Sequence, residues 1–571
     1  MRSGLRPGEA FASLAYACER GLPRDTVRIA AGDYTVTRVA IPTDAMTILG
    51  AGAGRPGTDT TQVTRFRASA DWTMRGTPNE FHYQNYMIAL SRDSMGLSSE
   101  VDSLTVRGIR FGASLDNLTD GAILLRLVDY PTLQDLHFED FAWTGIRLQL
   151  LEGFEVSDAT FVNVSRVEDD RFAGAIFTRY IAHGSLHDLV FRNTVPGDRQ
   201  WAVGYKGSGH TDVQLYNCDF RTGDGFDIEV PFENEYGFEI YNCYFNRTIS
   251  IPKSVQQDDP RSRGFDYSYW IHDCISESSY AIEGPRSHLR VSDNLFDITT
   301  DNGRIYTQFG GSIDGPVEFY RNIVVNADRA LFWNRDDQLR GVKVYNNTVV
   351  MRDSTPRAAA ILDVRNDLHG WDVRNNVFIN EAGLPRELGA NVGCASCTEH
   401  IRFSSNVLIN SATAFRQNEL DSNWVDVDLG FAEAPGGIEA YYTPAPGSFL
   451  IDRGEDVGLS YEGNAPDIGA VETDLTSSLR ESTDAKDKLR VWPSPAQAII
   501  QVELPDGHAA HVVSFCVRDL AGQVLLEERG GTRAGGDAYV IAVATLTRGV
   551  YVVEARAATR ALLGRGSFLK W

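Results

Sequence analysis

The chain has 571 residues, of which 77 are acidic and 54 basic, giving a formal net charge of −23. This charge argues against nucleic acid as the main partner. Seven cysteines are too few for a disulfide scaffold, and no apolar run reaches the roughly 18 residues that a transmembrane helix needs.

The chain opens with a helix and a first coil of strands, which we assign to residues 1–50. Residues 8–20 (GEAFASLAYACER) have helical character, and the stretch DTVRIAAGDYTVTRVAIP after them alternates like a strand, a turn and a strand. The first residues lack the apolar core of a signal peptide. We therefore expect either a cytosolic protein or a sequence that begins after its natural start.

A short motif recurs through the following 300 or so residues. Clear copies are VQLYNCDF (213–220), VKVYNNTVV (342–350) and IRFSSNVLI (401–409). A unit this short cannot bury its own apolar face, so it must stack against its neighbours. Equivalent positions span 297 residues in eleven steps, a mean of 27, and form one column: Ile109, Leu136, Ala159, Leu189, Cys218, Cys243, Cys274, Asn294, Asn322, Asn347, Asn376 and Asn406.

The composition of the repeat predicts an all-β solenoid. Val, Ile, Tyr and Phe alternate with period two, which is typical of strands. We predict a parallel β-helix of about twelve coils over residues 51–472, with its Asn column forming a side-chain ladder. For Cys218, Cys243 and Cys274 we favour buried free thiols; a thiol pair is the alternative, since adjacent coils lie about 4.8 Å apart.

Both ends of the repeat region resemble secreted pectate-lyase-like β-helix proteins. In that family a helix caps the first coil and the next strand ends in a GxY turn, here GDY at 32–34. Residues 441–472, with GSFLIDRG and DIGAVE, resemble the closing segment of such proteins. The resemblance implies a right-handed helix, and it bears on architecture alone.

A polar linker (473–488) and a small β-sandwich (489–571) are predicted to follow. VWPSPA (491–496), DLAGQVL (519–525), LTRGVYVV (546–553) and FLK (568–570) resemble the C-terminal sorting domain of the type IX secretion system. Ser494 stands where that family usually has Asn, and Trp492 where Tyr is common. The resemblance implies a secreted or cell-surface protein of a Bacteroidota-type bacterium, with the secretion machinery as partner, and it favours the missing-start alternative.

Candidate site residues lie on strands that follow the ladder strands, such as QWAVGYKGS (200–208) and GFDIEVPFE (225–233). Lysine is scarce, with six in the chain, yet two of the three in the repeat region lie on these strands. Alternation predicts that Ile228 points inward and that Asp227 and Glu229 face solvent. The predicted catalytic residues are Lys206, Lys253, Glu229, Glu283 and Arg286, and the predicted substrate-binding residues are Trp201, Tyr205, Tyr306, Trp333 and Arg335.

These residue types suit polysaccharide cleavage by β-elimination in a monomeric protein. The chemistry needs a base for the C5 proton of a uronate and a cation that neutralises its carboxylate. Lys206 or Lys253 is the candidate base, and Asp227, Glu229 and Glu233 are candidate Ca²⁺ ligands. VGYKGSGHTDVQLYNCDF (203–220) resembles family-6 polysaccharide lyases, which implies that Lys206 is the base. That family's Arg-His pair and upstream calcium ligands are absent here, since Glu229-Val230 occupies the next strand.

Two other functions remain open. Glycoside hydrolysis needs two carboxylates at a fixed separation, and Asp224, Asp227, Glu229 and Glu283 are candidates. A glycan-binding adhesin would use the same surface without a base. Elsewhere, Cys394 and Cys397 could form a loop disulfide or, with His400, part of a metal site, and we favour the former.

Overall fold

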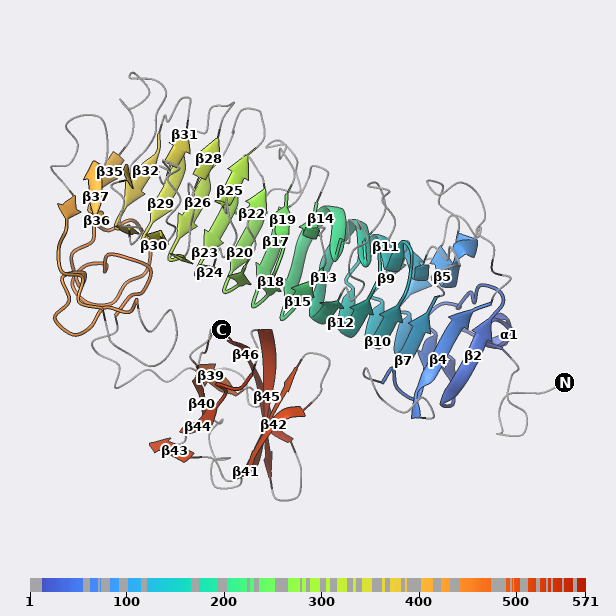
Figure 1. Cartoon of the computed structure of the whole chain (residues 1–571). Helices are drawn as coiled ribbons and strands as arrows, with labels where there is room; N and C mark the ends of the chain where they lie inside the picture. The colour runs from blue at the N-terminus through green and yellow to red at the C-terminus, as the bar shows by residue number, and fades with distance from the viewer. Residues whose placement is uncertain are drawn as a thin grey trace. The chain divides into compact units, whose positions relative to one another are not determined.

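The computed structural model is a right-handed parallel β-helix followed by a β-sandwich, which confirms the predicted fold class (Figure 1). It describes residues 13–54, 62–69, 72, 83–91, 101–113, 121–165, 174–192, 203–222, 226–230, 236–251, 265–277, 280–283, 288–297, 304–308, 316–325, 332–334, 341–351, 362–364, 370–380, 386–387, 402–413, 423–431, 442–473, 489–492, 496, 498–503, 512–519, 524–529, 532–535, 538–546, 549–557 and 562–570.

The chain divides into two compact units. Unit 1 comprises Met1–Glu239, Ile249–Pro252 and Asp259–Phe265, and unit 2 comprises Ile240–Thr248, Lys253–Asp258 and Asp266–Trp571. The elements up to residue 239 are α1 (Leu14–Arg20), β1 (Thr26–Arg28), β2 (Gly32–Val36), β3 (Thr47–Leu49), β4 (Thr64–Ala68), η3 (Tyr83–Asn85), β5 (Tyr86–Ser91), β6 (Val101–Asp102), β7 (Thr105–Gly112), β8 (Gly121–Arg126), β9 (Val128–Asp129), β10 (Thr132–Glu139), β11 (Thr144–Glu152), β12 (Glu155–Val162), β13 (Ile176–Arg192), β14 (Tyr205–Tyr216), β15 (Asp219–Arg221) and β16 (Phe226–Glu229).

The later coils contain shorter strands: β17 (Tyr236–Tyr241), β18 (Tyr244–Phe245), β19 (Thr248–Ser250), β20 (Tyr269–His272), β21 (Ile275–Ser276), β22 (Tyr280–Glu283), β23 (Leu289–Ser292), β24 (Leu295–Asp297), β25 (Arg304–Gln308), β26 (Val317–Tyr320), β27 (Ile323–Val325), β28 (Phe332–Asn334), β29 (Val342–Tyr345), β30 (Thr348–Met351), β31 (Leu362–Val364), β32 (Asp372–Arg374), β33 (Val377–Asn380), β34 (Arg386–Glu387), β35 (Arg402–Ser404), β36 (Val407–Ile409), β37 (Ser411–Thr413) and β38 (Trp424–Val425).

The C-terminal residues form two antiparallel sheets around a common core, as the sequence predicts. One sheet has the order β39-β40-β44-β43 and the other β42-β41-β45-β46, and Phe515, Tyr539 and Phe568 are among the side chains of their shared core. The strands are β39 (Arg490–Trp492), β40 (Ile499–Glu503), β41 (Val512–Asp519), β42 (Val524–Arg529), β43 (Thr532–Gly535), β44 (Ala538–Ala542), β45 (Gly549–Ala557) and β46 (Leu562–Lys570).

Each coil has three strand positions. In the later coils a ladder strand ends two residues before the predicted column, a second strand follows the column, and a third strand leads to the next ladder strand. In the first coils neighbouring positions merge into one long strand, as in β13 and β14. The candidate site strands are the third strands. They follow the repeated motif after a turn, as predicted, and short second strands such as β15 stand between them and the column.

Unit 1 confirms the column and packs a stack of aromatic rings beside it. The register aligns Ile109, Leu136, Ala159 and Leu189. Two residues after each column position a phenylalanine is buried in the core, and consecutive rings lie nearly parallel with centroids 5.4, 4.9, 4.9 and 4.4 Å apart. These rings stack in register because parallel strands place equivalent residues side by side. They are Phe111, Phe138, Phe161, Phe191 and Phe220.

Unit 2 confirms the asparagine ladder. The Asn347 Oδ1 atom accepts a bond from the backbone N–H of Asn322 at 2.9 Å and from its side-chain amide at 3.0 Å. The same pair of bonds joins Asn294 to Asn322, Asn347 to Asn376 and Asn376 to Asn406. Asn423 extends the ladder by one step that the sequence analysis missed.

The cysteines of the column are buried free thiols, which confirms the favoured alternative. Each thiol donates to the carbonyl two residues before it, from Cys218 to Tyr216 at 3.2 Å and from Cys274 to His272 at 3.1 Å. Ladder asparagines bond the equivalent carbonyl, as Asn347 does with Tyr345. In the coils without a ladder asparagine, the small cysteine side chain, a weak hydrogen-bond donor, therefore occupies the column. Cys394 and Cys397 lie outside the described residues.

The closing segment packs on the last coils, as its resemblance implies. Its Leu450 and Ile468 join a core cluster with Val350, Val377 and Val407. It is also hydrogen-bonded to the turns of two coils. The Asn346 side chain donates to the Asp467 carbonyl at 2.7 Å, and the Asn375 side chain exchanges two bonds of 2.8 Å with the Glu455 backbone.

Glu472 makes the closing segment sensitive to pH. Burial, with the charge of Asp467, raises the pKa of Glu472 to about 7, against the effect of its backbone hydrogen bonds. Its pKa is thus higher in the folded than in the unfolded protein, so its stabilising contribution is complete below the unfolded pKa and is lost as pH rises through about 7. Between about pH 5 and pH 8 we expect amide exchange of residues 442–473 to accelerate more than the intrinsic exchange rate does. Glu472→Gln should remove most of this additional acceleration. An equal excess in the variant contradicts the assignment.

Candidate active site

The third strands of unit 1 bring two predicted site residues into register. β8, β11, β13, β14 and β16 run parallel, and one residue from each lies in a single row. We call this set the Lys206 row, and it contains Leu124, Arg147, Phe177, Lys206 and Glu229. Two of the five predicted catalytic residues are therefore direct neighbours.

Lys206 and Glu229 form an ion pair at the end of this row. The distance from Lys206 Nζ to Glu229 Oε2 is 2.9 Å, with the Lys206 side chain 1% exposed and that of Glu229 20% exposed. A buried ammonium needs a charged partner to offset its lost hydration. The prediction that this row faces solvent holds for Glu229, which reaches the surface, whereas Lys206 is covered.

Three arginines lie on β8, β11 and β13 of the same sheet, and none of them is among the predicted site residues. The Arg147 guanidinium lies 4.9 Å from the centre of the Phe177 ring, and its Nη1 donates to Tyr86 Oη at 3.5 Å. A neighbouring row aligns Arg126, Gln149 and Arg179. In these two rows four cations therefore accompany one carboxylate, in a protein whose net charge is −23. Such a local excess of positive charge attracts anions.

Tyr205 is not available to a sugar ring, which corrects its predicted role. Its side chain is 0% exposed, and its hydroxyl forms a triangle with Thr178 Oγ1 at 2.7 Å and His210 Nε2 at 2.8 Å, while the latter two atoms are also 2.8 Å apart. Gly207 makes room for this triangle, because a Cβ there would lie 2.1 Å from Thr178 Oγ1. This polar triangle holds β13 and β14 together beneath the Lys206 row.

Asp227 is fully buried, so the prediction that it faces solvent is wrong. It is 0% exposed and accepts a hydrogen bond from the Thr222 hydroxyl. Asp227 and Ile228 are consecutive and both fully buried, so exposure does not alternate at the start of β16. Within the described residues no group of three or more His, Cys, Asp or Glu side chains is arranged to hold a metal ion. Calcium binding stays a prediction, since Glu233 lies outside the described part of the chain.

The remaining predicted residues fall partly or wholly outside the described part. Three of them lie on β22, β25 and β28, namely Glu283, Tyr306 and Trp333. Tyr306 is in register with Ile282, and Thr307 is in register with both Glu283 and Trp333. The structure does not describe their side chains. Lys253, Arg286, Trp201 and Arg335 lie outside the described residues, as does His400.

The last residues match a family by sequence. Residues 490–563 fit the model of the family described as "Secretion system C-terminal sorting domain". The β-sandwich is a secretion sorting domain. It implies export of the protein to the cell surface or the medium. No helix in the described part of the chain is long and apolar enough to cross a bilayer.

Solved structures similar to this chain are β-helix proteins at 8 to 12% identity. A mutant tailspike protein of E. coli bacteriophage HK620 with a pentasaccharide has a TM-score of 0.48 at 8% identity, covering 93% of this chain and 86% of that one. An alginate lyase from Paenibacillus has 0.31 at 12%, covering 54% and 91%, and the Streptococcus pneumoniae surface adhesin PfbA 0.40 at 10%, covering 66% and 89%. No curated protein matches in sequence.

Proposed function

We propose that this protein is an exported enzyme that cleaves an acidic polysaccharide by β-elimination at Lys206 and Glu229. The observation that carries the proposal is their 2.9 Å ion pair on a third-strand sheet that also presents three arginines. A buried lysine beside a partly exposed carboxylate supplies a proton donor and a proton acceptor at one place.

The ion pair changes the role that the sequence suggested for Lys206. A lysine held against a carboxylate carries its proton, so it is poised as an acid, and the 20% exposed Glu229 is the group poised as a base. In the proposed reaction Glu229 takes the C5 proton of a uronate. The C5–H electrons form the new C4=C5 double bond as the C4–O bond breaks, and Lys206 protonates the departing oxygen. Transfer of the proton from Glu229 to Lys206 restores the pair.

The surrounding arginines define the class of substrate. Removing the C5 proton builds negative charge on a uronate carboxylate, and fixed cations stabilise that charge where water is excluded. Arg126, Arg147 and Arg179 supply positive charge on β8, β11 and β13 of the same sheet. A polymer with one carboxylate per sugar therefore complements this sheet better than a neutral glucan.

Hydrolysis is the competing chemistry. It requires two carboxylates that both reach the scissile bond. Glu229 reaches the surface, but Asp227 is fully buried. The Lys206 row contains no second carboxylate, and the side chains of the other two candidates, Asp224 and Glu283, lie outside the described residues. The preference for elimination therefore rests on the Lys206–Glu229 pair.

A product-monitored screen tests the proposal. The full-length protein is incubated with alginate, polygalacturonate, glycosaminoglycans, carrageenan and dextran. Elimination yields the ultraviolet absorbance of an unsaturated uronate on an acidic substrate, and none on dextran. New reducing ends without that absorbance indicate hydrolysis. Binding of the acidic polymers without cleavage of any indicates a glycan-binding protein.

A further inference from the structure

A second surface on unit 2 carries two rows of side chains on the outer side of its ladder strands. We call this surface the ladder face. The register of β20, β23, β26, β29, β32 and β35 is continuous. Its first row comprises Trp270, Arg290, Glu318, Lys343, Asp372 and Arg402, and its second row comprises His272, Ser292, Tyr320, Tyr345, Arg374 and Ser404. From Arg290 onward the first row alternates in charge.

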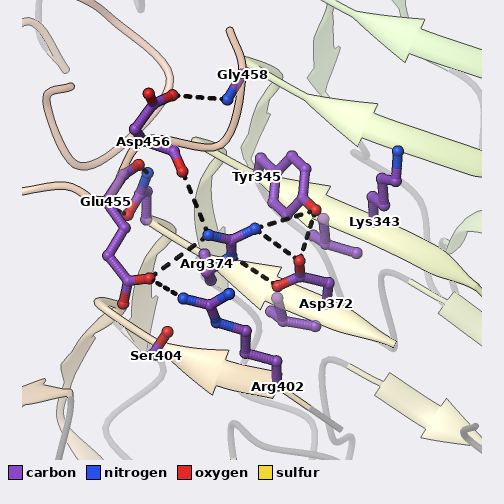
Figure 2. A network of polar contacts seen from close by, with 12 residues as sticks. Lys343, Tyr345, Asp372, Arg374, Arg402, Ser404, Glu455, Asp456 and Gly458 are labelled. Atoms are coloured by element: carbon purple, nitrogen blue, oxygen red, sulfur yellow. Dashed lines mark hydrogen bonds and ion pairs between the residues drawn. The ribbon is translucent and has the colours of Figure 1, made fainter. Parts of the chain in front are cut away.

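At its C-terminal end the ladder face binds an acidic segment of the chain itself (Figure 2). The Glu455 carboxylate is ion-paired with Arg402 and with Arg374 at 3.5 Å, and it accepts a bond from Ser405 Oγ at 2.8 Å. Arg374 also donates to the Asp456 carbonyl at 3.4 Å. Burial acts to raise the pKa of Glu455, but the serine hydrogen bonds and both arginine charges outweigh it and lower that pKa. The two rows thus hold a carboxylate of the closing segment.

Three coils earlier the same rows carry cations beside aromatic rings. Arg290 lies 5.5 Å from the ring centres of both Tyr267 and Trp270, and these two rings are 5.5 Å apart. Trp270 and Tyr267 are partly exposed. Trp270 also donates to Ser292 Oγ at 3.0 Å, which fixes the indole over the next strand. Aromatic rings held this way are suited to stacking against the apolar face of a sugar.

Glu318 holds the two cations of this region in place. Its carboxylate bonds Arg290 Nε at 3.1 Å and Lys343 Nζ at 2.8 Å. Burial acts to raise its pKa, but these bonds and charges outweigh it and lower the pKa, so Glu318 is ionised. The Lys343 side chain is nonetheless 43% exposed. Arg290 and Lys343 together exceed Glu318 by one positive charge, and each has several donors.

We propose that the ladder face between β20 and β29 is a second binding site for an acidic polysaccharide, separate from the Lys206 row. Sugar rings stack on Trp270 and Tyr267, and carboxylates bond Arg290 and Lys343 as Glu455 bonds Arg374 and Arg402. These four strands span about 14 Å at ~4.8 Å per step, enough for several sugars. The choice of an acidic polymer rests on the proposed function, whereas the site itself rests on the geometry of unit 2.

Binding measurements on variants test this site. Affinity electrophoresis of the full-length protein carrying Glu229→Gln uses alginate and polygalacturonate as probes and dextran as the neutral control. We expect Arg290→Gln with Lys343→Gln to weaken binding to the acidic probes about tenfold, and Trp270→Phe less. Arg38→Ala is the matched control, because it removes one exposed cation whose partner is Glu19 in unit 1; it should change binding less than twofold or so.

The outcomes separate this proposal from the proposed function. The site is overturned if Arg290→Gln with Lys343→Gln binds as tightly as the Arg38→Ala control, or if all variants lose affinity equally. If the double variant fails to fold, Lys343→Gln alone is measured instead, because Lys343 is well exposed. The site is then overturned if this single variant binds as tightly as the control. If no polysaccharide is cleaved but binding depends on Arg290 and Lys343, the ladder face stands and the enzymatic proposal falls.

Discussion

Replacing Glu229 with glutamine is expected to lower the rate of unsaturated product release about 10³-fold while acidic polysaccharide still binds. The amide cannot accept the C5 proton, yet it keeps the size of the carboxylate and an oxygen for Lys206. Lys206→Met should lower turnover by a similar factor because the leaving oxygen loses its proton donor. Initial rates of ultraviolet absorbance on the best substrate of the screen measure both effects.

A charge-swapped variant separates catalysis from folding. Either single change leaves one member of a buried ion pair without its counterpart, which costs about 3–5 kcal/mol when the remaining charge is fully buried. The double variant Lys206→Glu with Glu229→Lys restores an ion pair but exchanges the positions of acid and base. We expect it to recover part of the stability lost in the single variants, measured by thermal unfolding, and none of the turnover.

Two results would contradict this assignment. Turnover within about tenfold of the native rate in both single variants would place the chemistry elsewhere on the third strands. Loss of turnover that returns with the charge-swapped pair would mean that Lys206 and Glu229 act only by holding β14 and β16 together. Arg179→Gln serves as a graded comparison, since it removes an exposed cation of the same sheet without touching the pair.

The ladder strands could be predicted from the sequence because their column has chemically distinctive residues at a nearly constant period. Asn347 and its equivalents repeat with the spacing of one coil, so a one-dimensional pattern fixes a three-dimensional register. Asn423 was missed because it follows Asn406 by 17 residues, well short of the mean step of 27. A short coil therefore hides a ladder residue that the hydrogen bonds reveal.

The third strands could be found from the sequence, but the exposure of their side chains could be predicted only in part. No residue type repeats along them, and stretches of varying length separate them from the second strands, so neither register nor parity can be counted along the chain. Asp227 and Ile228 are both buried, which no alternating pattern predicts. Arg147 and Lys206 lie in one row only because β11, β13 and β14 are in register. Their place in the same row therefore depends on how the coils stack, which the sequence does not show.

The largest loss of stability is expected at the asparagine ladder, with Asn347→Ala as the central test. Asn347 Oδ1 accepts two bonds from Asn322, and Asn347 Nδ2 donates to the carbonyls of Phe319 and Tyr345 at 3.0 Å each. The substitution takes the acceptor from the buried Asn322 N–H and removes one bond each from the Asn322 side-chain amide and the two carbonyls, at about 1–3 kcal/mol for a group left unpaired. We expect a total loss of about 3 kcal/mol or more, seen as faster amide exchange in β26, β29 and β32.

Asn347→Asp should be more damaging than Asn347→Ala, because its carboxylate would face two carbonyl oxygens in the core where the amide now donates. Asn464→Ala is the matched control: this exposed asparagine has a 3.4 Å side-chain contact with Asp452 and lies outside the ladder. The expected order of stability is therefore Asn464→Ala, then Asn347→Ala, then Asn347→Asp. Equal stability of the two Asn347 variants would show that the amide donors contribute little. In that case packing of the column, as in the cysteine coils, would hold the solenoid together.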